Sequence, residues 1–93
     1  MNTQEAHQIA NPTILEILED LKHIKESQAD TWAVEYVNPI LKGILIAQEK
    51  EIEFLTSEFF IYLGIDNKYQ TIKVRKRLEA LKLSCQDLRR VLK

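Results

Sequence analysis

The sequence predicts an all-α fold, a three-helix antiparallel bundle in which the last two helices form a hairpin with coiled-coil-like pairing. The 93 residues include only two Gly and two Pro, too few for the turns of an all-β fold. The hydrophobic content of 45% is typical of a globular chain. A chain of this length forms one domain with a thin core. We expect residues 1–10, which are polar and lack periodicity, to be a flexible N-terminus, and residues 11–93 to be a single helical domain.

The first predicted helix begins near residue 11. Asn11 followed by Pro12 is typical of an N-cap with proline at the first helical position. Thr13 is an alternative start, because Glu16 stands three residues later in the spacing of a capping box. Apolar residues then recur at helical spacing, and this helix is expected to end near Gln28.

The segment Trp32–Val37 admits two interpretations. Its apolar residues alternate and are β-branched or aromatic, which is compatible with a short strand. We favour a helix, because a single strand would have no partner in an otherwise helical chain. Pro39 lacks a backbone N–H and is expected to kink or break the helix before it, with Asn38-Pro39 starting a new one.

A long central helix is predicted from Pro39 to Leu63. Residues on one face recur at alternating spacings of four and three, as in a coiled-coil seam. These residues are Leu41, Leu45, Gln48, Ile52, Leu55, Phe59 and Tyr62. Gly64 is expected to end the helix in the left-handed conformation.

The last helix is predicted to start after a cap at Asp66 or Asn67 and to run to about Val91. Its apolar residues follow the same alternation: Val74, Leu78, Leu81, Cys85, Leu88 and Leu92. Because only two or three residues join the two seams, the helices are expected to pack antiparallel, with Gln48 opposite Leu81. This register places Arg77 near Glu51 and Glu53, Lys82 near Glu49, and Arg89 near Lys42.

The distribution of charge divides the chain. Residues 65–93 carry nine Lys and Arg against three Asp and Glu, a net +6, whereas residues 1–64 carry four against eleven, a net −7. Such asymmetry indicates that the basic part contacts either its own acidic body or an external polyanion.

Signatures of an enzyme are missing from the sequence. His7 stands in the expected flexible terminus, His23 stands on a helix face, and Cys85 occupies a seam position where a free cysteine packs like a small hydrophobe. Neither metal-ligand spacing nor a glycine-rich phosphate loop occurs. We therefore expect no catalysis, cofactor, metal or small-molecule substrate.

The cellular setting is indicated by composition. A single cysteine favours a reducing, cytoplasmic location. The longest nearly apolar run, Ile40–Ala47, is too short to cross a bilayer, so no membrane partner is expected.

The leading functional hypothesis is a non-catalytic regulator, adaptor or inhibitor that acts through helix-surface protein contacts and self-associates. The central helix has more apolar residues than one partner helix can cover, so either the first helix covers part of the excess or this face meets another chain. The basic helix also has cations without an obvious acidic neighbour. The predicted partner-binding residues are Ile46, Phe54, Phe60, Ile61, Arg75, Lys76, Arg89 and Arg90.

An alternative is a small DNA-binding regulator. The segments Leu55-Thr56-Ser57-Glu58 and Leu63-Gly64-Ile65, followed by the basic stretch Arg75–Leu81, resemble bacterial helix-turn-helix proteins of the excisionase and winged-helix type. The resemblance implies that the second helix reads the major groove. The DNA-facing residues would then be Asn67, Lys68, Gln70, Thr71, Lys73 and Arg75.

Overall fold

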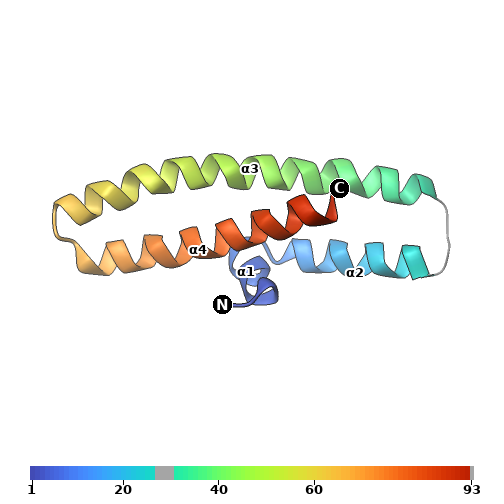
Figure 1. Cartoon of the computed structure of the whole chain (residues 1–93), viewed down its shortest axis with the longest axis horizontal. Helices are drawn as coiled ribbons and strands as arrows, with labels where there is room; N and C mark the ends of the chain where they lie inside the picture. The colour runs from blue at the N-terminus through green and yellow to red at the C-terminus, as the bar shows by residue number, and fades with distance from the viewer. Residues whose placement is uncertain (27–30, 93) are drawn as a thin grey trace.

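The computed structural model describes residues 1–26 and 31–92, and within those ranges it contains four α-helices and no strand. The helices are α1 (Thr3–Ala10), α2 (Thr13–Glu26), α3 (Thr31–Gly64) and α4 (Lys68–Val91). The molecule is elongated, 54 × 20 × 17 Å, and α3 runs along its long axis with α4 antiparallel beside it (Figure 1). The predicted all-α class, the long central helix and its close packing with the last helix are confirmed.

Helix α1 differs from the expected flexible terminus and adds a fourth helix to the predicted three. Asn2 caps it: its Oδ1 accepts the N–H of Glu5 at 2.8 Å, and its Nδ2 donates to Glu5 Oε1 at 3.0 Å. Ala6 and His7 are buried, and α1 packs mainly against α4. With only two buried side chains in eight residues, one of them polar, this helix shows no apolar periodicity in the sequence.

Asn11 separates α1 from α2 and serves both. Its backbone N–H donates to the carbonyl of His7 at 2.8 Å, which closes α1. Its side-chain Oδ1 accepts the N–H of Thr13 at 3.1 Å, as expected of an N-cap. Helix α2 ends at Glu26, and the predicted end near Gln28 lies outside the described residues.

Helix α3 is continuous from Thr31 to Gly64, with Pro39 inside it. The helical interpretation of Trp32–Val37 is therefore confirmed, and the predicted break at Pro39 is wrong. Val34 and Val37 pack against the core on one side of the proline, and Leu41 is fully buried on the other. Tertiary packing of this face outweighs the single backbone hydrogen bond that proline removes.

The turn between α3 and α4 takes its left-handed residue from Asp66 and not from Gly64. Asp66 has φ 55°, whereas neither glycine of the chain has a positive φ. The N–H of Asn67 donates to the carbonyl of Tyr62 at 3.0 Å and that of Asp66 to Leu63 at 3.2 Å, which is the Schellman pattern. Gly64 is thus the last helical residue, and the predicted left-handed cap at this position is wrong.

Helix α4 begins immediately after this turn. Asn67, one of the two predicted caps, is its N-cap, since its Oδ1 accepts the N–H of Gln70 at 3.2 Å. The helix ends at Val91, as predicted.

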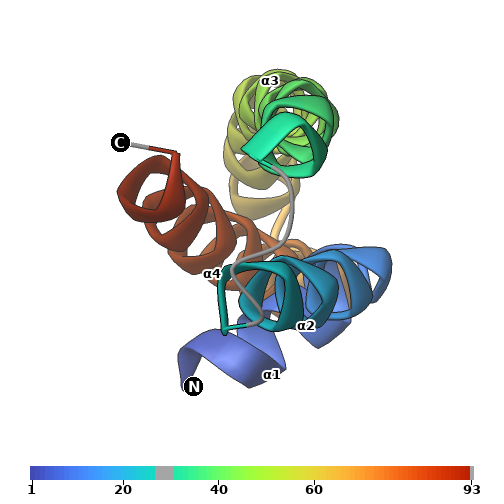
Figure 2. The same ribbon diagram turned by 90° about the vertical axis from the view of Figure 1, so that its right-hand side faces the viewer.

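Val74, Leu78 and Leu81 of α4 are buried, but the main core cluster lies in one half of the molecule, where α2 and the second half of α4 pack on the first half of α3. Its buried residues are Ile14, Leu21, Leu41, Leu45, Cys85 and Leu88. The other half, which contains the turn, is a two-helix arm of α3 and α4 alone (Figure 1). Seen along the long axis, α1, α2 and α4 all lie on one side of α3 (Figure 2). Among the described residues, no other helix therefore covers the opposite side of α3 from Val34 onward.

Candidate functional site

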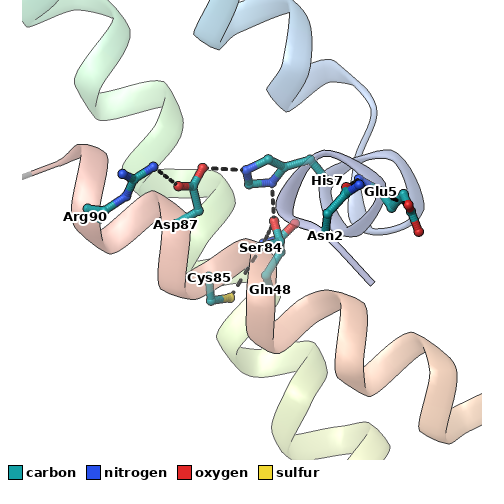
Figure 3. Close-up of polar contacts among 8 residues, drawn as sticks. All are labelled: Asn2, Glu5, His7, Gln48, Ser84, Cys85, Asp87 and Arg90. Carbon is teal, nitrogen blue, oxygen red and sulfur yellow. Dashed lines mark hydrogen bonds and ion pairs between the residues drawn. The ribbon is translucent and has the colours of Figure 1, made fainter.

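A buried polar network joins α1 to α4 (Figure 3). His7 lies between two residues of α4: its Nδ1 is 2.8 Å from Ser84 Oγ, and its Nε2 is 2.8 Å from Asp87 Oδ2. Gln48 of α3 donates from Nε2 to the same Ser84 Oγ at 3.0 Å. With Nε2–H directed at Asp87 and the Ser84 hydroxyl donating to Nδ1, every one of these contacts has a donor and an acceptor.

Asp87 is the charged member of this network. Burial alone would raise the pKa of Asp87, but hydrogen bonds from His7 and Arg90 outweigh burial and hold that pKa below its usual value. Arg90 Nη2 donates to Asp87 Oδ1 at 2.6 Å, so each carboxylate oxygen has a partner. The carboxylate is therefore ionised at neutral pH, and it accepts hydrogen bonds from both sides.

Serine, histidine and aspartate are the residue types of a nucleophilic triad, but their burial decides against that chemistry here. Ser84 is 0% exposed and His7 is 1% exposed. A nucleophile must reach its substrate, and a hydroxyl enclosed by three helices does not. The arrangement instead satisfies the polar groups that α1 brings into the interior. Over the described residues, no cluster of three His, Cys, Asp or Glu side chains is placed to hold a metal ion.

Cys85 packs in the core, as the sequence predicted, with 1% of its surface exposed. Burial raises the pKa of the Cys85 thiol, which keeps it protonated and poorly nucleophilic. Gln48 Nε2 also lies 3.5 Å from its Sγ. Gln48 was expected opposite Leu81, but its amide meets Ser84 and Cys85, about one turn further along α4, because a buried amide needs polar partners.

Arg77 connects α4 to two other helices. Its guanidinium donates to Glu51 of α3 at 3.0 and 3.1 Å, which confirms the predicted pairing with Glu51. It also donates to the carbonyl of Ile9, and to that of Ala10 at 3.2 Å, at the C-terminus of α1. A single cation therefore satisfies an acidic side chain and two carbonyls that the helix end leaves without intrahelical partners.

Three of the four cations predicted to contact a partner also have intramolecular partners. Arg89 pairs with Glu49 at 3.2 Å, in place of the predicted Lys82, and Arg90 pairs with Asp87. Arg75 pairs with Glu79 at 3.3 Å along α4. Lys76 is exposed and has no ion pair within residues 1–26 and 31–92.

The predicted apolar contact residues lie on the exposed side of α3. Ile46 is 48% exposed, Phe54 62%, Phe60 64% and Ile61 61%. Of the two alternatives for this face, the structure does not show cover by the first predicted helix, since α2 packs against the side that carries Leu41 and Leu45. These apolar side chains are therefore available to another molecule.

The exposed side of α3 carries a second heptad series, which we call the outer seam. Its eight positions alternate in spacing by four and three, and all eight residues are exposed: Tyr36, Ile40, Gly43, Ala47, Lys50, Phe54, Ser57 and Ile61. Of these eight residues, only Phe54 and Ile61 were among the contact residues predicted from the sequence. The continuity of α3 through Pro39 adds Tyr36 to the seven positions that lie within the predicted helix Pro39–Leu63.

The residues that would face DNA are partly engaged in the turn. The Asn67 side chain caps α4, and Thr71 Oγ1 donates to the Asn67 carbonyl at 2.7 Å. Lys68, Lys73 and Arg75 are exposed. A helix-turn-helix holds its two helices at about 90–120°, whereas α3 and α4 lie side by side and antiparallel (Figure 1).

Neither family models, nor curated proteins, nor solved structures give a match to this chain. Among the helices of the described residues, none combines the length and apolar character needed to cross a membrane. The geometry of the chain itself is thus the basis for assigning a function.

Proposed function

We propose that this chain is a non-catalytic interaction protein, a regulator, adaptor or inhibitor of the cytoplasm, whose binding surface is the exposed side of α3. One observation carries the proposal: large apolar side chains, among them Phe54 and Ile61, are more than half exposed on the face that no other helix covers. Single exposed apolar residues are common, but a row of them along one helix face is typical of an interaction site.

The difference between the two faces of α3, one packed in the core and one exposed, supports this proposal. The inner face would pair with α4 in the manner of a coiled coil and with α2, which together form the core. The buried network around His7 then fixes α1 on the far side of α4. The molecule so constructed offers a long, partly apolar helix to a partner, as in helix-in-groove recognition.

The experiment replaces Phe54 and Ile61 together by serine and measures capture of binding partners by the purified chain. Capture should be lost while the circular dichroism spectrum and unfolding midpoint stay close to those of the parent, because both side chains are exposed. A matched control replaces Tyr69 and Ile72 of α4, which are 72% and 68% exposed. Equal loss of capture in the control, or no loss in the Phe54/Ile61 variant, would contradict the proposal.

A second candidate, DNA binding, has one specific observation in its favour: Lys68, Lys73 and Arg75 are exposed on the first half of α4. The test is affinity for duplex DNA at two salt concentrations. Binding through several phosphates weakens steeply as salt rises. Absence of binding at low salt, or binding that charge reversal at Lys73 and Arg75 leaves intact, excludes this candidate.

A further inference from the structure

We propose that the molecule covering the outer seam of α3 is a second copy of this chain, docked antiparallel. In the proposed register, the residue numbers of two facing seam residues add up to 97. This inference rests on the proposed function, because it names the occupant of the same face. Antiparallel coiled-coil packing places one seam residue opposite each seam residue of the second helix. In this register all eight seam positions find a counterpart, from Tyr36 opposite Ile61 to Ala47 opposite Lys50.

Side-chain volume supports this register. The seam contains three small residues, and each of them faces a large one: Gly43 faces Phe54, Ala47 faces Lys50, and Ser57 faces Ile40. The remaining pair, Tyr36 with Ile61, joins two large side chains at the ends. Interdigitation of large and small residues is how close-packed interfaces avoid both voids and overlaps.

Neighbouring arrangements lose this complementarity. Moving the second copy by one heptad in one direction sets Gly43 against Ala47, and in the other direction it sets Ala47 against Ser57. Both shifts leave two small residues facing each other, and both leave seam positions without a counterpart. A parallel dimer brings Gly43 to Gly43 and Phe54 to Phe54. Each alternative therefore creates a void, which costs packing energy.

Gly43 itself is not explained by the single chain. A Cβ built on Gly43 meets no atom within 4 Å, and its φ is not positive. Glycine inside a helix is about 1 kcal/mol less favourable than alanine, so the fold of one chain alone would be better served by alanine. The phenyl ring of Phe54 from a second copy would occupy the open space next to Gly43.

Lys50 sets a limit on the strength of this dimer. In the proposed register the two copies of Lys50 lie next to the two-fold axis, where like charges repel. A single polar seam residue typically fixes register at a cost in stability. We therefore expect an association that tightens when Lys50 is replaced by leucine and when salt screens the charge.

The decisive experiment is disulfide mapping. In the double variant Gly43→Cys/Phe54→Cys, the two introduced thiols of one helix are about 16 Å apart, too far for a bond within one chain. Mild oxidation should therefore yield covalent dimers whose linked peptides join position 43 to position 54. The single variant Gly43→Cys should not cross-link to itself. In the antiparallel register the two copies of residue 43 are also about 16 Å apart along the helix axis. The native Cys85 is buried and does not compete.

A second measurement uses solution mass. Gly43→Leu should lower dimer affinity by about tenfold or more, while leaving the single chain folded, because the site is open. The inference is overturned if the parent is monomeric at every concentration tested, or if Gly43→Cys alone cross-links as efficiently as the double variant. If the chain is monomeric but the Phe54/Ile61 variant still loses its captured partner, the proposed function stands and only the second copy is refuted.

Discussion

The Nε2 atom of His7 lies 2.8 Å from Oδ2 of Asp87, a residue 80 positions further along the chain. This contact, with that of Nδ1 to Ser84, attaches the first helix to the last. Asp87 is 9% exposed, so the hydrogen bonds form in surroundings that hold little water. Buried hydrogen bonds of this kind specify one arrangement, since breaking one leaves an unsatisfied polar group in the interior.

Acid should weaken the fold through Asp87. The hydrogen bonds from His7 and Arg90 hold the pKa of Asp87 below its unfolded value. The ionised carboxylate therefore contributes stability that is fully present above about pH 4 and is lost as pH falls through the lower, folded-state pKa. Urea unfolding of the parent and of Asp87→Asn across the acid range measures this contribution. The difference between the two should shrink below pH 4, and a difference that is constant with pH contradicts the prediction.

Replacing His7 by alanine should release α1. Ser84 and Asp87 would then lack their buried partner, at a cost of about 1–3 kcal/mol in the free energy of unfolding. Hydrogen exchange at the amides of Thr3–Ala10 should quicken more than exchange in α3. The control is His23→Ala, since His23 is 69% exposed beside Glu19 and its loss should change stability by no more than about 0.5 kcal/mol. Equal effects of the two variants would show that burial of His7 is unimportant.

Arg77 should matter more than a surface arginine on the same helix. Arg77→Met removes hydrogen bonds to Glu51 and to two carbonyls of α1, and a loss of about 1–2 kcal/mol is expected. Arg75→Met removes only the exposed pair with Glu79, which is worth about 0–1 kcal/mol. Thermal unfolding of both variants makes the comparison. Unfolding midpoints that fall by the same amount would mean that the α1 contacts of Arg77 add nothing.

The two long helices are predictable from the sequence because the information is local. Apolar residues at spacings of three and four mark the buried faces of α3 and α4 directly, and Asn67 marks the start of α4. The exposure of Phe54 and Ile61 follows from the same helical geometry. Two other features, helix α1 and the continuity of α3 through Pro39, depend by contrast on tertiary structure.

Helix α1 and the continuity of α3 could not be predicted for the same physical reason. The burial of His7 is favourable only because Ser84 and Asp87, near the other end of the chain, form hydrogen bonds with its ring. Helix through Pro39 is favourable only because Val37 and Leu41 are packed by α2 and α4. One signal was present: Gln48, a polar residue in an apolar seam, indicates polar partners in the interior.

The turn between α3 and α4 offers a test of conformation at two neighbouring positions. Gly64 is helical with open space around it, so Gly64→Ala should raise the free energy of unfolding by about 0.5–1 kcal/mol. Asp66 has φ 55°, so Asp66→Ala should lower it by about 1 kcal/mol, because alanine lacks the local hydrogen bonding that lets aspartate adopt this conformation.

Chemical denaturation of the two variants, with Asp66→Gly as a third, decides between the two assignments of the left-handed residue. Asp66→Gly should match or exceed the parent, since glycine adopts positive φ without steric cost. If Gly64 were the left-handed cap, the order would reverse, with Gly64→Ala the damaging change and Asp66→Ala nearly neutral. The relative stabilities of the two alanine variants therefore report directly on which residue turns the chain, and with it on the register in which α4 meets α3.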